Sequence, residues 1–156
     1  RELLVEGHQT YVIDDAELTR VRDGFQNLWN DPKGDPTAVY IGCPHNTSEE
    51  MVYWSEKLSE ALGEATQEKL AIPLVMASSV VVRDRLLDEH PVLYRDMIRA
   101  GVQFTNICTP AYQGLRGMAD IVWGVTNSNK GRFYTKLRLY DDDDLVQIAL
   151  TGKVPY

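Results

Sequence analysis

The sequence contains few cysteines, no long apolar run and no excess of basic residues, and each shortage argues against a class of protein. Only 2 of the 156 residues are cysteine, too few for a scaffold held together by disulfides. No apolar run approaches the roughly 20 residues that span a bilayer. The 16 basic residues are outnumbered by 23 acidic ones, and the net charge of -7 disfavours nucleic acid and anionic membranes as partners. We therefore expect a soluble, cytoplasmic protein that binds neither.

The remaining composition is that of an ordinary globular domain. Hydrophobic residues make up 44% of the chain and charged residues 25%, close to the average, so a folded core is expected. A chain of 156 residues suits one domain. Because it starts without methionine and inside an apolar segment, we expect residues 1–156 to be a single α/β domain from a longer polypeptide.

Apolar patterns predict alternating strands and helices. The predicted strands cover residues 38–42, 71–77, 102–107, 120–126 and 137–140, and a looser alternation covers the first twelve residues. The predicted helices cover residues 15–28, 47–62, 80–87, 92–100 and 141–149, with a short helix or turn at 132–136. Pro73 places the second strand at an edge or marks its start, because proline donates no ladder hydrogen bond. This alternation predicts an α/β fold, a mainly parallel sheet with helices on both faces.

Helix start signals accompany several of these segments. Asp14 is a candidate N-cap, and the stripe after it predicts a buried helix face: Leu18, Val21, Phe25 and Leu28. Thr47 and Glu50 have the spacing of a capping box, and a second stripe follows them: Met51, Trp54, Leu58 and Leu62. The aspartates from Asp141 to Asp144 suit a helix N-terminus, so we interpret them as a solvated cap rather than a metal site.

Polar loops follow three of the predicted strands, at residues 43–45, 108–110 and 126–130. Sites in parallel sheets form beyond the carboxyl ends of the strands, so these loops are the candidate site. Cys43 and Cys108 follow their strands in equivalent positions. The helix start after Cys43 is expected to lower the pKa of its thiol, which would suit a nucleophile and a metal ligand equally. A lone cysteine is also often a small buried apolar residue, and that interpretation stays open.

The cysteines lack the paired local spacing of a structural zinc site, so thiolates from separate loops favour iron or an iron–sulfur cluster. Two thiolates leave the metal shell incomplete, so a third ligand or an open position is needed. His45 has three interpretations: a general acid or base, a hydrogen-bond donor to substrate, or a structural helix cap. A nucleophilic pair of Cys43 with His45 is disfavoured, because residues two apart in a turn seldom point at each other.

The third loop is a candidate anion site. Ser128 and Lys130 combine a possible helix N-terminus with an ammonium group, which suits a phosphate or carboxylate. The glycine spacing of a P-loop is absent, and Gly124 ahead of Lys130 does not restore it. A purely structural loop remains an alternative.

Together these motifs resemble the aconitase X family. The segment Tyr40-Ile41-Gly42-Cys43-Pro44-His45, with Glu49-Glu50 after it, is similar to the family's Gly-Cys-Pro-His segment. The segment Thr126-Asn127-Ser128, with Lys130, is similar to the family's Thr-Asn-Ser-x-Lys segment. A cysteine after the intervening strand and a closing Thr151-Gly152-Lys153 also fit, and the resemblance runs from about residue 10 to the end.

The resemblance implies a hydro-lyase with an aconitase-like three-layer fold and an iron or iron–sulfur centre. The family includes phosphomevalonate dehydratases and cis-3-hydroxy-L-proline dehydratases, so a small hydroxy acid is the implied substrate. In that comparison Cys43 and Cys108 are metal ligands and His45 assists departure of the hydroxyl group. The implied substrate-binding residues are Asn127, Ser128 and Lys130.

Family members are much longer, so the resemblance implies the carboxyl-terminal part of a large subunit. The implied partners are the remaining large-subunit segment and a small swivelling domain or subunit that carries a catalytic serine. Two segments depart from the family: Asn106-Ile107 replaces an acidic Asp-Thr before Cys108, and Phe133 stands where histidine is common. The alternative functions are a non-catalytic α/β module that binds a small anion or a partner subunit, and a thiol enzyme that uses Cys43 and His45.

Overall fold

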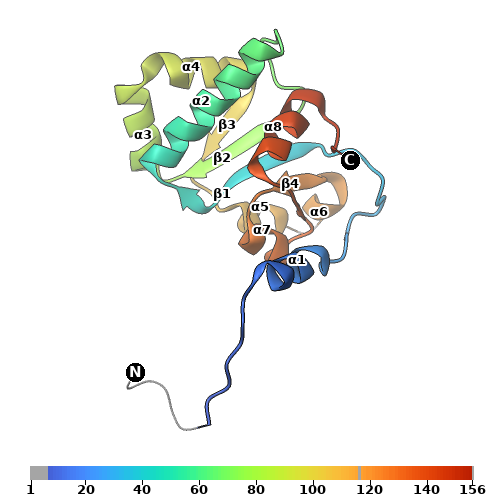
Figure 1. Cartoon of the computed structure of the whole chain (residues 1–156). Coiled ribbons are helices and arrows are strands. Elements are labelled where there is room, and N and C mark those ends of the chain that lie inside the picture. Colours follow the sequence, from blue (N-terminus) through green and yellow to red (C-terminus); the bar gives the residue numbers. More distant parts are fainter. Residues whose placement is uncertain (1–6, 116, 156) are drawn as a thin grey trace.

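The computed structural model describes residues 7–115 and 117–155, and at Ala119 it describes only the backbone. Its centre is a five-stranded sheet in the order β3-β2-β1-β4-β5, in which every neighbouring pair is parallel (Figure 1). The strands are β1 (Ala38–Asn46), β2 (Leu74–Ser78), β3 (Val102–Thr105), β4 (Gly124–Thr126) and β5 (Arg138–Leu139). The helices are α1 (Asp15–Asp23), α2 (Ser48–Glu64), α3 (Val80–Glu89), α4 (Pro91–Ala100), α5 (Thr109–Gln113), α6 (Met118–Ile121), α7 (Asn129–Tyr134) and α8 (Asp142–Thr151).

The strand order reverses direction in the middle of the sheet. From β1 the chain adds β2 and β3 on one side, and it then crosses to the other side of β1 to add β4 and β5. In doubly wound sheets, ligands bind at the carboxyl ends of the strands where the order reverses. The carboxyl ends of β1 and β4 therefore define the candidate site.

One face of the sheet carries the larger core. Val39 and Ile41 of β1 point to this face together with Leu74 and Met76 of β2, as the two-residue period of a strand requires. Four helices supply the facing side chains, which include Met51, Trp54, Leu58, Leu86, Met97, Leu145 and Ile148. Full burial of one such side chain stabilises the fold by roughly 1.5–3 kcal/mol.

The capping box and the buried stripe predicted for α2 are both present. The Thr47 hydroxyl accepts a hydrogen bond from the Glu50 amide at 3.2 Å, and the Glu50 carboxylate accepts one from the Thr47 amide at 2.8 Å. This capping box satisfies backbone donors at the helix start. All four residues of the predicted stripe are buried: Met51, Trp54, Leu58 and Leu62.

The opposite face of the sheet has a much smaller core, made of Ala38, Tyr40 and Leu137. The Tyr40 hydroxyl accepts a hydrogen bond of 3.0 Å from the side-chain amide of Gln113 in α5, and burial raises the pKa of Tyr40. A groove of about 410 Å³ stays open beside this contact. Ile121, on its wall, is 71% exposed. Helices lie on both faces, but they fill only one of them.

Helix α1 begins where predicted, with the Asp14 carboxylate accepting a hydrogen bond from the Glu17 amide at 2.8 Å. It ends at Asp23, earlier than predicted, and the prediction that its apolar stripe is buried was wrong. Leu18 is 59% exposed and Leu28 is 51% exposed. The stripe predicts a helix correctly, but such a face is buried only where another element packs on it.

Two further predictions need correction. The strand predicted at 120–126 is a strand only from Gly124, because α6 occupies residues 118–121. A Cβ atom at Gly124 would lie 2.4 Å from Leu137 and 2.7 Å from the Tyr40 ring, so only glycine lets β4 approach these side chains. The first part of the alternation predicted for residues 1–12 lies outside the described residues. Residues 8–14 have no regular structure, and they extend away from the sheet in Figure 1.

The remaining predicted elements occur in the predicted order with shifted ends, whereas helix α5 was not predicted. Strand β2 begins just after Pro73, and the predicted turn at 132–136 is helix α7. The predicted fold class, a mainly parallel α/β sheet with helices on both faces, is confirmed. Within residues 7–115 and 117–155, no helix is both long and apolar enough to cross a membrane.

Candidate functional site

A break in the regular pairing of β1 presents Cys43 at the carboxyl edge of the sheet. The register with β2 shifts between Ile41 and Asn46, and Gly42 adopts a left-handed φ of 96° there. A Cβ atom at Gly42 would lie 2.3 Å from the Ala77 carbonyl oxygen. The Asn46 side chain donates a hydrogen bond to that same oxygen at 3.1 Å. Gly42 is therefore required by the local backbone, and Asn46 closes the irregular segment against β2.

Ser128 joins the loop after β4 to the loop after β1. Its hydroxyl donates a hydrogen bond to the Cys43 carbonyl oxygen and accepts one from the Gly131 amide at 2.8 Å. Its own amide donates to the Thr126 hydroxyl at 3.1 Å. Ser128 is thus the N-cap of α7, and it holds the start of this helix against the Cys43 backbone at the reversal point of the sheet.

The two cysteines lie within interaction range of each other at the carboxyl edge of the sheet. Both are free thiols, Cys43 being buried and Cys108 half-buried at the start of α5. Burial is the main cause that raises the pKa of Cys43, while a contact with Ser128 lowers it. Cys108 further raises this pKa and Lys130 lowers it, which places both groups within interaction range of the Cys43 thiol. The expected lowering by the helix dipole was wrong, because burial outweighs it.

The other predicted site residues differ in what they offer. Asn127 donates a hydrogen bond of 2.8 Å to the Asp142 carboxylate, so its amide helps attach the loop to α8. His45 and Lys130 are exposed at the same edge of the sheet. Of the predicted substrate-binding residues, Lys130 is the one whose polar group faces solvent, whereas the polar groups of Asn127 and Ser128 bond within the chain.

The donor set fits part of a soft-metal site. Two neighbouring thiols suit iron or an iron–sulfur cluster, since thiolates are the preferred ligands of such centres. Among residues 7–115 and 117–155, no group of three or more His, Cys, Asp or Glu side chains is arranged to hold a metal ion. The two thiols are therefore the residues that could hold such a metal ion.

A parallel sheet with two thiols and an ammonium group at its reversal point defines a candidate enzyme domain of the α/β class. No family model matches the sequence. The chain is 29% identical over 159 residues to the phosphomevalonate dehydratase large subunit of Thermococcus kodakarensis, a match that covers 96% of this chain and 36% of that subunit. It also matches the crystal structure of Thermococcus kodakaraensis aconitase X in its holo form, with a TM-score of 0.70 and 26% identity over 95% of this chain and 36% of that one.

These matches confirm that the chain is similar to the aconitase X family, a family of dehydratases, over nearly its whole length. The chain spans only about a third of the length of the relatives that it matches, 36% in both comparisons. The activity, substrate and partners of the complete enzyme are therefore questions for a proposal.

Sequence reasoning missed a second set of polar residues, which line a cleft beside β5. A signal was present: residues 130–138 contain four basic side chains and no acidic one, in a chain that is acidic overall. The pattern was overlooked because two of these residues fall on a short helix and one on a two-residue strand, neither of which has a clear periodicity.

Proposed function

We propose that this chain is the carboxyl-terminal part of the large subunit of an aconitase X-type hydro-lyase, with residues 1–156 forming one α/β domain. The observation that carries the proposal is that Cys108 and Lys130 lie within interaction range of the Cys43 thiol at the carboxyl edge of the sheet. The similarity to two aconitase X-type relatives supports it. The proposed substrate is a small hydroxy acid such as phosphomevalonate or cis-3-hydroxy-L-proline, and the proposed location is the cytoplasm.

In this proposal Cys43 and Cys108 hold an iron ion or an iron–sulfur cluster. When bound, the iron supplies a Lewis acid for the departing hydroxyl group. The irregular end of β1 fixes the Cys43 backbone through Gly42 and Ser128, so the first thiol is positioned before any ligand arrives. The Cys108 thiol comes from the start of a separate helix and is more accessible.

Lys130 binds the carboxylate or phosphate of the substrate, because its exposed ammonium group lies at the same edge as the thiols. Ser128 and Asn127 act with it mainly as positioning residues, since their side chains hold this loop against β1 and α8. His45 donates the proton that lets the hydroxyl leave as water. A base from the rest of the assembled enzyme removes the proton from the adjacent carbon, and the electron pair of that C–H bond forms the new double bond.

The remaining catalytic groups come from outside this chain. The missing metal ligand is assigned to the rest of the large subunit, and a catalytic serine to a small swivelling domain or subunit. The coverage of 36% of the relatives supports such an assembly, since most of their length has no counterpart here.

The second candidate function is a non-catalytic module that binds a small anion or a partner subunit. One observation favours a non-catalytic role. The Ser128 hydroxyl and the Asn127 amide, both candidates for substrate binding, are occupied by hydrogen bonds within the chain. A thiol enzyme that uses Cys43 and His45 is less well supported, because the buried Cys43 thiol has a raised pKa and is a poorer nucleophile.

The deciding measurement is the iron and acid-labile sulfide content, with the visible spectrum, of anaerobically purified protein and of every chain that copurifies with it. We expect iron, with thiolate charge-transfer absorption, together with a stoichiometric partner chain. Cys43→Ser and Cys108→Ser should each remove most of the iron without changing the circular dichroism spectrum. Iron content that is unchanged in Cys43→Ser would contradict the proposed ligand, and a folded protein without metal or partner would favour the binding module.

The role of Lys130 is tested in the assembled enzyme by its dehydration kinetics. Lys130→Ala removes a charge-assisted contact to the substrate and should raise KM by about tenfold or more. Lys69→Ala removes an exposed lysine that lies away from the site and should leave KM unchanged. Equal KM values for the two variants would remove Lys130 from the substrate-binding set.

A further inference from the structure

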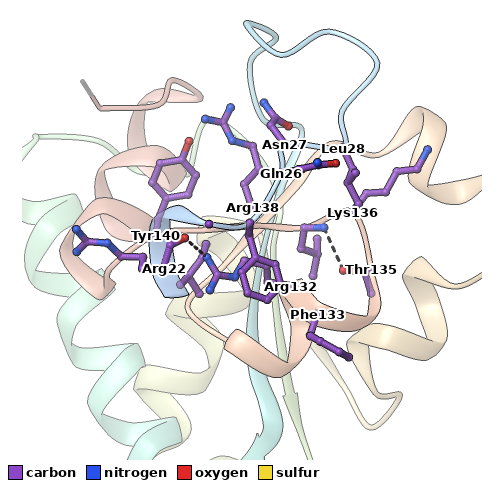
Figure 2. Close-up of a pocket in the computed structure, with 14 residues that line it drawn as sticks. Arg22, Gln26, Asn27, Leu28, Arg132, Phe133, Thr135, Lys136, Arg138 and Tyr140 are labelled. Carbon is purple, nitrogen blue, oxygen red and sulfur yellow. Dashed lines mark hydrogen bonds between the residues drawn. The ribbon is translucent and has the colours of Figure 1, made fainter. Parts of the chain in front are cut away.

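A cleft of about 610 Å³ lies between the segment after α1 and the segment from α7 to β5 (Figure 2). Its walls carry four basic residues: Arg22, Arg132, Lys136 and Arg138. No aspartate or glutamate is among the described residues that line it. The whole chain has 23 acidic and only 16 basic residues, so this lining reverses the overall charge balance. A cationic cleft in an acidic protein attracts an anion.

Arg138 is the basic residue best placed to bind a ligand. Its guanidinium carbon lies 4.8 Å from the centre of the Trp29 ring and 5.5 Å from that of Tyr140. In Figure 2 the side chain rises from β5 toward Asn27. No carboxylate of the part of the chain that the structure describes forms an ion pair with it. The two rings restrict the guanidinium, so its planar set of donors is already oriented for an oxyanion.

Arg132 adds a second, more deeply buried charge. Its guanidinium donates hydrogen bonds to the Arg22 carbonyl oxygen at 2.6 Å and to the Asn129 side chain at 2.8 Å, and it lies 3.7 Å from the centre of the Phe25 ring. The side chain is only 9% exposed, and within the described residues it forms no ion pair. Burial lowers its pKa, and the charge of Asp23 only partly opposes this effect, so an anion in the cleft would offset the remaining cost.

The two other basic residues contribute less. Lys136 pairs with Asp120 at 2.6 Å and Arg22 pairs with Asp23 at 3.1 Å. Both side chains extend outward in Figure 2, in different directions. Because each is paired with a carboxylate, they add little net positive charge to the cleft and are not available as direct ligands.

The size and rim of the cleft indicate a small organic molecule. Its volume lies within the range of about 300–1,000 Å³ that is usual for small-molecule sites. Leu28 and Phe133, which are 51% and 66% exposed, offer apolar contacts beside the charges. A phosphate monoester carries about 1.5 to 2 negative charges at pH 7, which matches two guanidinium groups that form no ion pair with any described carboxylate.

We propose that this cleft binds the phosphate group of a small organic molecule, with Arg138 as the direct ligand and Arg132 as the second positive charge. The apolar part of the ligand lies against Leu28 and Phe133. The site is separate from the thiols, and the proposal does not depend on the proposed dehydratase activity.

The test is a titration of the 156-residue chain with inorganic phosphate and with phenyl phosphate at constant ionic strength, followed by calorimetry and amide NMR. We expect saturable binding, tighter for phenyl phosphate, with shifts concentrated in residues 22–28 and 132–140. Arg138→Gln should weaken binding by about tenfold or more, because it removes charge-assisted hydrogen bonds. Arg138→Lys keeps the charge but not the planar donors and should give an intermediate loss.

Arg99→Gln is the matched control, since it removes an equal charge from an exposed position on α4 outside the cleft. It should change affinity by less than about twofold, as expected for a distant exposed charge. Circular dichroism establishes that each variant is folded, and Arg138→Lys serves as the test if Arg138→Gln is not.

Three results would overturn the proposal: no saturable binding by the folded protein, an equal loss in Arg99→Gln, or shifts centred on residues 126–130. Equal affinity for inorganic phosphate and phenyl phosphate would contradict the proposed contacts with the organic part of the ligand. Because no readout here involves iron or turnover, a failed dehydratase assay would leave this result unaffected, and the reverse also holds.

Discussion

The two faces of the sheet differ in how completely they are filled. On the face covered by α2 and α8, side chains such as Val39, Leu58 and Ile148 are fully buried in one continuous core. On the other face, three residues form the core and a groove of about 410 Å³ stays open. Both faces belong to the same five strands, so the difference arises from the helices and not from the sheet.

The filled face contributes most of the stability of the fold, whereas the open face has apolar side chains available for binding. Most of the apolar burial is on the filled face, and it supports strands whose carboxyl ends carry the thiols. The open face leaves apolar side chains such as Ile121 and Tyr112 exposed, and exposed apolar patches often mark interaction surfaces. Substitutions on the filled face should therefore lower the free energy of unfolding much more than substitutions on the open face.

The largest loss of stability is expected from Leu58→Ala on the filled face. The substitution leaves a cavity around a side chain that is 0% exposed, so the free energy of unfolding should fall by about 3 kcal/mol. Chemical denaturation followed by circular dichroism measures this change. Leu87→Ala on α3 is the control, because Leu87 is 43% exposed and its loss should cost less than about 1 kcal/mol. Similar values for the two would contradict the assigned core.

A smaller loss of stability is expected from a substitution at Gly42, in the irregular part of β1 beside the candidate site. Gly42→Ala forces a side chain into a left-handed conformation and against the Ala77 carbonyl oxygen, which should cost about 2 kcal/mol. Gly63→Ala in α2 has open space around its Cβ and should be neutral or stabilising by up to about 1 kcal/mol. Denaturation midpoints distinguish the pair, and an equal response would show that the β1 irregularity is unstrained.

Tyr40→Phe tests the limited polar packing of the open face. The variant loses the hydrogen bond from Gln113 and should be destabilised by about 1 kcal/mol at pH 7. Burial raises the pKa of Tyr40 in the folded protein, so its contribution is present below the unfolded value of about 10 and is lost as the pH rises through the folded pKa. Melting temperatures from about pH 8 to pH 11 should therefore fall more steeply for the natural protein than for the variant. If the melting temperatures of the two proteins changed with pH in the same way, the raised pKa of Tyr40 would be contradicted.

The smallest effect is expected from Ile121→Ser at the groove. Ile121 is 71% exposed, so the free energy of unfolding should change by less than about 0.5 kcal/mol. The same denaturation experiment measures it. A loss above about 1 kcal/mol would mean that this face is covered in solution.

Much of the fold could be predicted from the sequence where local signals agree with tertiary packing. The capping box and stripe of α2 predicted a helix that is buried on the predicted side. Two cysteines follow parallel strands in equivalent positions, and in the structure the Cys108 thiol lies within interaction range of Cys43. Such inferences succeed because strand direction alone decides which loops meet.

Other features depend on contacts that no local pattern encodes. The stripe of α1 predicts an amphipathic helix but cannot say whether anything covers it, and Leu18 remains exposed. Residues 121–123 are apolar and suit a strand, yet α6 extends through Ile121. The hydrogen bond from Ser128 to the Cys43 carbonyl joins residues 85 positions apart, so the positioning role of this hydroxyl is visible only in three dimensions.

The stacked indoles of Trp29 and Trp123 give the molecule an intrinsic optical reporter. Their ring centres are 5.9 Å apart and their planes differ by 20°, and the Trp29 nitrogen donates a hydrogen bond to the Lys136 carbonyl oxygen. Arg138 lies directly over the Trp29 ring. Of the three tryptophans, only Trp54 belongs to α2, away from this pair. Any ligand that draws the Arg138 charge away from the indole should therefore change tryptophan emission, so occupancy of the cleft can be followed in an unlabelled protein.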